Sequence, residues 1–223
     1  MFNKLRQLML AVITGACLLP IAAADVNAGL QALAGQDYAT ALREFDNAAR
    51  QGNADAQYSL AHMYESGQGV AQNYGKAVKW YRKAAEQNYM LAQNNLAFMY
   101  ENGQGVARNY PEAVKWFRKA ADRGYALAQY NLGRIYAQGK GLPQDYVQAY
   151  LWTALAAAQR DAGAQENMNL LAARMTPTQI TRAKKQVTTW LRQHGAGDSR
   201  VNPESEPDDS IAPSEGADKT FRL

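Results

Sequence analysis

The sequence predicts an all-α fold, a solenoid built from helix hairpins. Three observations favour it: a segment that recurs every 36 residues, apolar side chains at helical spacing within each copy, and paired glycines between the two helical stretches. A period between about 20 and 50 residues indicates units that bury their apolar faces by stacking on one another.

The repeat is clearest in a segment that begins with Ala-Gln and ends with Leu, at residues 56–60, 92–96 and 128–132. The same 36-residue offset relates further positions, which are Tyr64, Tyr100 and Tyr136, and Trp80, Trp116 and Trp152. This constant register predicts three stacked units of equal length.

Each unit contains two apolar patterns with helical spacing. In the first unit they are Ala56, Leu60, Met63 and Tyr64, followed by Ala77, Trp80, Tyr81, Ala84 and Ala85. Between them Gly67 and Gly69 are expected to adopt positive φ, which ends the first helix and turns the chain. Each unit is therefore predicted to be a helix hairpin.

The pattern extends in weaker form beyond both ends of these units. Residues 37–52 match residues 73–88, so a shortened unit is expected to precede these three units. It is expected to begin near Val26 and to turn tightly at residues 34–38. After a second helix at 145–160, we expect a helix at about 162–174. A final helix opens with a capping box at residues 176–179. Its predicted buried face, which caps the solenoid, contains Ile180, Ala183, Val187, Trp190 and Leu191.

The consensus of the unit resembles a known family. It is Ala-x-x-x-Leu-(Ala/Gly)-x-x-Tyr-x-x-Gly-x-Gly-Val followed by Tyr-x-x-Ala-Val-x-Trp-(Tyr/Phe)-x-Lys-Ala-Ala, at residues 56–85 and 92–121. This pattern resembles the Sel-one-like repeats, relatives of the tetratricopeptide repeats, over residues 26–160. The resemblance implies a right-handed α/α superhelix that serves as an adaptor or assembly scaffold, and bacterial members are often exported.

The N-terminus has the features of a secretory signal. Lys4 and Arg6 precede an apolar run at residues 8–21, and Ala22 to Ala24 offer a cleavage site before Asp25. The apolar run is too short for a membrane span, which needs about 20 residues. We expect cleavage after Ala24 and no membrane span in the mature chain.

A lipoprotein signal that ends before Cys17 is the alternative. The apolar stretch that continues from residue 18 to residue 24 argues against it. The chain is thus divided into a signal peptide at 1–24, a solenoid at 25–195 and a tail at 196–223 that is predicted to be disordered. From Asp198 onward the tail carries seven acidic and three basic side chains.

No catalytic motif is found in the sequence, and neither an enzyme activity nor a cofactor is expected. His62 and His194 lie far apart and without ligand spacing, so no metal site is expected either. The formal net charge of +4 is too mild to indicate nucleic-acid binding.

A partner-binding groove is predicted on the first helices. Positions two before, two after and five after the core leucine point about 160°, 200° and 140° away from it. If the solenoid curves as the resemblance implies, these positions line its concave side. The predicted groove residues are Tyr58, His62, Glu65, Asn94, Phe98, Glu101, Tyr130 and Arg134.

The second helices carry a repeated basic edge, which consists of Lys79, Arg82, Lys83, Lys115, Arg118 and Lys119. This edge suits an anionic glycan or membrane surface. A simpler interpretation is that cations near a helix C-terminus offset the helix dipole.

These features predict an exported, periplasmic or secreted scaffold for protein–protein interactions in a bacterial envelope. It is expected to be monomeric or transiently associated and to bind a protein or peptide. The alternative hypotheses are an accessory protein of glycan or peptidoglycan and an envelope hydrolase.

Overall fold

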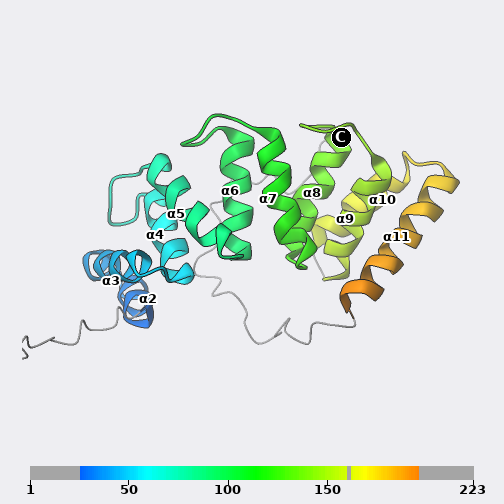
Figure 1. The fold of residues 1–223 in the computed structure, drawn as a ribbon. Coiled ribbons are helices and arrows are strands. Elements are labelled where there is room, and N and C mark those ends of the chain that lie inside the picture. The colour runs from blue at the N-terminus through cyan, green and yellow to red at the C-terminus, as the bar shows by residue number, and fades with distance from the viewer. Residues whose placement is uncertain (1–25, 160–161, 196–223) are drawn as a thin grey trace, which may run out of the picture.

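The computed structural model describes residues 26–159 and 162–195, so the predicted signal peptide and the acidic tail lie outside the described residues. Within these ranges the chain forms ten α-helices and no strand. They follow one another along an elongated arch (Figure 1). The predicted all-α repeat solenoid is confirmed. The helices are α2 (Val26–Ala34), α3 (Tyr38–Arg50), α4 (Ala54–Ser66), α5 (Tyr74–Glu86), α6 (Met90–Asn102), α7 (Tyr110–Asp122), α8 (Ala126–Gln138), α9 (Tyr146–Ala158), α10 (Ala162–Ala172) and α11 (Pro177–Gly195).

The backbone repeats in register with the sequence. The first helices α4, α6 and α8 and the second helices α5, α7 and α9 each contain 13 residues. Each helix from α2 to α10 packs against its neighbours in chain order. The last helix differs, because α11 packs mainly against α9.

The second helices begin with a repeated side-chain cap. The backbone N–H of Lys76 donates to the side-chain oxygen of Asn73 over 2.9 Å, and that of Glu112 donates to Asn109 over 3.1 Å. Asp37 and Asp145 cap α3 and α9 in the same way. Such caps satisfy backbone donors that a helix start leaves without partners, so they define where each second helix begins.

The paired glycines have two different roles. Gly103 ends α6 in the left-handed region at φ +72°, as predicted. Gly105 also has positive φ, and a Cβ there would overlap the backbone of Tyr74 in the preceding unit. The second glycine therefore permits both a turn and a close approach between units.

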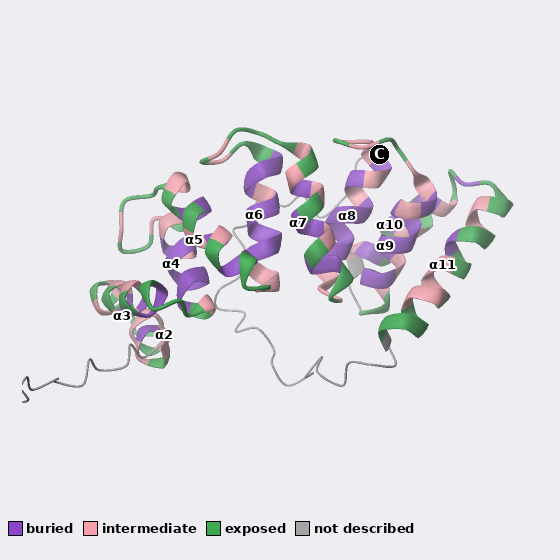
Figure 2. Ribbon diagram, in the orientation of Figure 1, coloured by how far each residue is buried: buried purple, intermediate pink, exposed green. Residues whose placement is uncertain are grey.

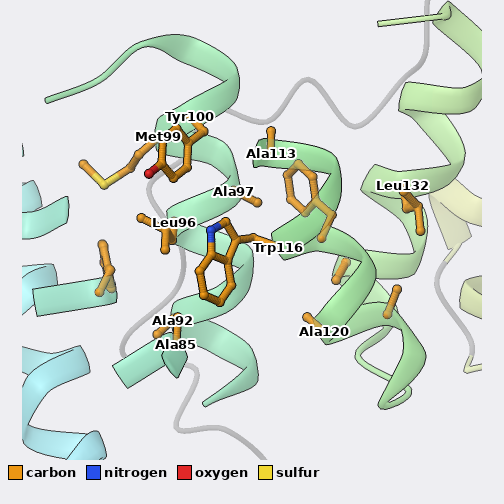
Figure 3. Close-up of a cluster of buried hydrophobic side chains, with 14 of the residues drawn as sticks. Ala85, Ala92, Leu96, Ala97, Met99, Tyr100, Ala113, Trp116, Ala120 and Leu132 are labelled. Carbon is orange, nitrogen blue, oxygen red and sulfur yellow. The ribbon is translucent and has the colours of Figure 1, made fainter. Parts of the chain in front are cut away.

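The core runs through the stacked units. Leu60, Leu96 and Leu132 are fully buried, which confirms the predicted register. Figure 3 shows the indole of Trp116 beside Leu96, between small alanine side chains of neighbouring helices. Burial is most continuous along the first helices and α9, whereas α3 and α11 each present an exposed face (Figure 2).

The C-terminal helix caps the solenoid as predicted. The side chain of Gln179 accepts from the N–H of Thr176 over 2.9 Å, and the N–H of Gln179 donates to the Thr176 hydroxyl over 3.3 Å. Ala183 is buried, and Ile180, Val187 and Trp190 are partly buried. The placement of Leu191 on the buried face was wrong, because its side chain is 43% exposed. It follows Trp190 by one residue, about 100° around the helix axis, and so turns away from α9.

Among the described helices, none combines the length and the apolar character that a membrane crossing requires.

Candidate functional site

We name the eight predicted groove positions on α4, α6 and α8 the first-helix row. Tyr58, Asn94, Glu101 and Tyr130 are buried, at most 7% exposed, and the other four are partly buried. The expectation that the whole row faces solvent was therefore wrong. The row consists of Tyr58, His62, Glu65, Asn94, Phe98, Glu101, Tyr130 and Arg134.

Direct contacts between successive first helices explain this burial. The Nδ2 of Asn131 on α8 donates to the Oδ1 of Asn94 on α6 over 3.2 Å. In the next junction, the Nδ2 of Asn167 on α10 donates to the hydroxyl of Tyr130 over 2.9 Å. On the side opposite the core leucine, successive first helices thus form a second packed layer. The side chains of the row are therefore more buried than the geometry of a single helix predicts.

An ion pair joins the second and third units within this row. The guanidinium of Arg134 donates to both carboxylate oxygens of Glu101, over 2.8 and 2.6 Å. The side chains are 15% and 5% exposed, and the Nζ of Lys140 lies 3.9 Å from the same carboxylate. This paired, bidentate geometry compensates the cost of burying the carboxylate.

Glu65 occupies the same repeat position in the first unit but has a different environment. Phe98 stands where Arg134 stands one unit later, and within the described residues no cation forms an ion pair with Glu65. Its carboxylate instead accepts a 2.6 Å hydrogen bond from the hydroxyl of Tyr81. Burial raises the pKa of Glu65, and the bond from Tyr81 opposes that rise.

Aromatic rings surround the same end of the row. The ring of Tyr58 lies 5.6 Å from that of Tyr81 and 5.3 Å from that of Tyr89, between ring centres. Burial raises the pKa of Tyr58 and also raises that of Tyr125 to about 12. Sequence reasoning missed Tyr89 and Tyr125 as members of this surface, although their 36-residue offset was a usable indication.

Two aromatic residues of the predicted groove, Phe98 and Tyr130, are integrated into the fold. Phe98 makes an edge-to-face contact with Phe117, with ring centres 5.6 Å apart. Tyr130 is 7% exposed and bonded to Asn167. Replacing both with alanine is expected to lower stability, because each ring packs against a neighbouring helix. The partly buried His62 has a pKa lowered by burial.

The predicted basic edge separates into two groups. Arg82 and Arg118 donate to the hydroxyls of Tyr100 and Tyr136 in the following unit, over 2.6 and 2.5 Å, so they join units together. The four lysines of the edge are exposed, and they are Lys79, Lys83, Lys115 and Lys119. The edge available to a ligand is thus narrower than the sequence indicated.

In the part of the chain that the structure describes, no group of three or more His, Cys, Asp or Glu side chains is suited to hold a metal ion. His194 stacks on Trp190 with ring centres 4.1 Å apart. Its Nδ1 lies 2.9 Å from the carbonyl oxygen of Trp190.

The helix hairpins and their 36-residue register define a helical-repeat protein, and comparison with known proteins gives its family. The Sel1 repeat family model matches residues 54–89, 91–125 and 126–161. The structure is similar to that of a Sel1 repeat protein from Oxalobacter formigenes, with a TM-score of 0.65 and 31% sequence identity, over 76% of this chain and 70% of that one. This chain belongs to the Sel1 repeat family.

A second solved structure is also similar. It is a protective antigen, c5321, of uropathogenic Escherichia coli strains that displays an SLR fold, with a TM-score of 0.55 and 30% identity. The match covers 77% of this chain and 45% of that chain. No curated protein matches this chain. The family match and the two similar structures confirm the predicted resemblance. Sel1 repeat proteins are generally scaffolds for protein–protein interaction.

Proposed function

We propose that this chain is an exported scaffold of the bacterial envelope whose first-helix row binds a peptide segment of a partner protein through a basic side chain. The observation that carries the proposal is the difference between Glu65 and Glu101. Equivalent carboxylates occupy equivalent positions, but only Glu101 has an arginine from the next unit. An arginine or lysine of a partner is suited to take the corresponding place at Glu65.

The surroundings of Glu65 suit such a segment. His62 lies one helical turn earlier on α4, and Phe98 and Tyr89 are partly buried on the neighbouring helix and at its start. Aromatic side chains provide apolar contact area at a small entropic cost, and they are frequent anchors in interfaces. The neighbouring tyrosines are already packed together, so little rearrangement is needed on binding.

A peptide screen tests the binding mode. Peptides selected from a random library against the chain from residue 25 onward should be enriched in arginine or lysine beside an aromatic residue. Glu65→Gln should weaken the selected peptides by about tenfold or more, because it removes a charge-assisted bond in a partly buried site.

Glu112→Gln is the matched control, since that carboxylate lies on α7 and pairs with Lys115. It should leave the affinity unchanged. Equal effects of the two substitutions, or selected peptides without basic residues, would contradict the proposed mode. Salt-sensitive binding of peptidoglycan strands in place of peptides would favour the glycan accessory.

Export is tested separately. N-terminal sequencing of the protein recovered from the periplasm or medium should begin at Asp25. An acylated chain that begins at Cys17 would establish a lipoprotein instead.

A further inference from the structure

The outer surface of α5 and α7 carries lysines packed beside tryptophans. The Nζ of Lys83 lies 4.1 Å from the ring centre of Trp80, and that of Lys119 lies 4.4 Å from Trp116. A shallow depression on α5 is lined by Lys76, Lys79, Trp80, Arg82, Lys83 and Glu86. We name the outer face the set Lys76, Lys79, Trp80, Lys83, Lys115 and Lys119. Trp116 lies beneath the lysines of α7 and is buried.

The equivalent surface of the third unit is covered by the chain itself. Leu151 and Leu155 on α9 stand at the positions of Lys79 and Lys83, and both are buried. Trp152 is only 1% exposed and meets Trp190 of α11 edge to face, with ring centres 6.3 Å apart. One segment C-terminal to the repeats thus already packs on this side of the solenoid.

The outer face has an excess of positive charge. Within the described residues, no carboxylate lies within ion-pair distance of Lys76, Lys79, Lys83 or Lys119, whereas Lys115 pairs with Glu112 over 3.1 Å. The acidic side chains on the same two helices are Glu86, Glu112 and Asp122. The adjoining α11 adds four basic side chains and no acidic one. An anionic chain is therefore the occupant that the charges favour.

The described chain ends beside this face. Val187 and Trp190 of α11 pack against the hydrophobic cluster that contains Trp116. In the last turn, His194 lies close enough to Asp122 at the end of α7 to oppose the rise that burial causes in the pKa of that carboxyl. The described chain therefore ends near the C-terminal end of α7.

We propose that residues 196–223 bind back along the outer face of α5 and α7 as an acidic intramolecular cover. These residues contain seven acidic and three basic side chains. Their extended reach of about 90 Å exceeds five helix-to-helix spacings of about 10 Å each, so the segment can reach α5. A tethered segment has a high effective concentration near the face, so several exposed ion pairs that are weak individually can hold it there together. Because salt screens such pairs, high salt should dissociate the contact. Such a cover competes with any external anionic partner for the same lysines.

Zero-length crosslinking tests the placement directly. A water-soluble carbodiimide, applied to the chain from residue 25 to 223 at low salt, should join tail carboxylates to Lys79, Lys83, Lys115 or Lys119 within monomers. These products should disappear at high salt. Crosslinks confined to Lys184 and Lys185, crosslinks found only in dimers, or none from the tail would overturn the proposal.

A binding measurement provides an independent check that leaves the helices intact. In one variant, the amide variant, each of the seven acidic residues of the tail is replaced by its amide, Asp→Asn or Glu→Gln. The binding probe is a labelled peptide with the unmodified sequence of residues 196–223. The amide variant should bind this peptide about tenfold more tightly than the unmodified chain, because its own tail no longer competes.

Binding of the peptide to the amide variant should be abolished by four further substitutions, Lys79→Gln, Lys83→Gln, Lys115→Gln and Lys119→Gln. The matched control adds Lys184→Gln and Lys185→Gln to the amide variant instead and should leave the binding unchanged. Equal affinity of the amide variant and the unmodified chain would refute the cover.

Discussion

The first unit of the solenoid has the same backbone as the second and third units, yet equivalent side chains in these units have different partners. Glu101 is paired with Arg134 of the following unit, whereas the carboxylate of the equivalent Glu65 accepts a hydrogen bond from the Tyr81 hydroxyl, and Phe98 occupies the position equivalent to Arg134. On the outer side, Trp152 is covered by α11, whereas the equivalent Trp80 is partly exposed and contacts the ammonium group of Lys83.

This difference separates the residues that maintain the fold from those that remain available. The second unit has an ion-pair partner for its buried carboxylate within the chain, and the outer tryptophan of the third unit is covered by α11. In the first unit, by contrast, Glu65 has no ion-pair partner among the described residues and Trp80 is partly exposed. Glu65 and the depression on α5 both belong to the first unit, so each proposed binding surface includes the part of the repeat where the chain supplies fewer of its own contacts.

The largest effect is expected at the covered tryptophan. Trp152→Ala should destabilise the protein by about 3–5 kcal/mol, because it empties a fully buried site between α9 and α11. Trp80→Ala should cost less than half as much, since its ring is partly exposed. Urea denaturation of both variants measures the difference. Equal losses would show that the two units are closed to the same extent.

A second test compares the two carboxylates. Arg134→Met should destabilise by about 3 kcal/mol, because it leaves the carboxylate of Glu101 buried with only a distant lysine. Adding Glu101→Gln should recover part of that loss. Glu65→Gln at neutral pH should cost little, since burial already disfavours the charged form and the amide oxygen can still accept from Tyr81. A large loss in Glu65→Gln would place a cation near that side chain.

The smallest effect concerns His62. Its folded pKa is lowered from 6.5 by burial, so the unfolded chain takes up the proton first as the pH falls. Its contribution to stability is present above pH 6.5 and is lost as the pH falls from there through the lower folded pKa. Histidine usually titrates between about pH 7.5 and about pH 5.5. As the pH falls across this range, His62→Gln should therefore lose less stability than the wild type. Parallel losses in both proteins would show that His62 does not contribute.

The sequence by itself determined the repeat length, the helix hairpins, the glycine turns and the capping box that begins α11. These features depend on local chemistry, since helix spacing, caps and positive φ are decided within a few residues. Leu96 illustrates this, because its predicted core position needs only the register of its own helix.

Only the tertiary structure decided which side chains of the first-helix row and of the basic edge remain accessible. Tyr130 lies opposite a core leucine, but Asn167 of α10 contacts its hydroxyl. Arg118 belongs to the predicted basic edge, but its guanidinium donates to the hydroxyl of Tyr136 in the following unit. The geometry of a single helix predicts the direction of a side chain, but it does not predict which other segments pack against that side chain. Contacts such as Arg134 with Glu101 join residues 33 positions apart, and they exist only because stacking the units brings two helices together.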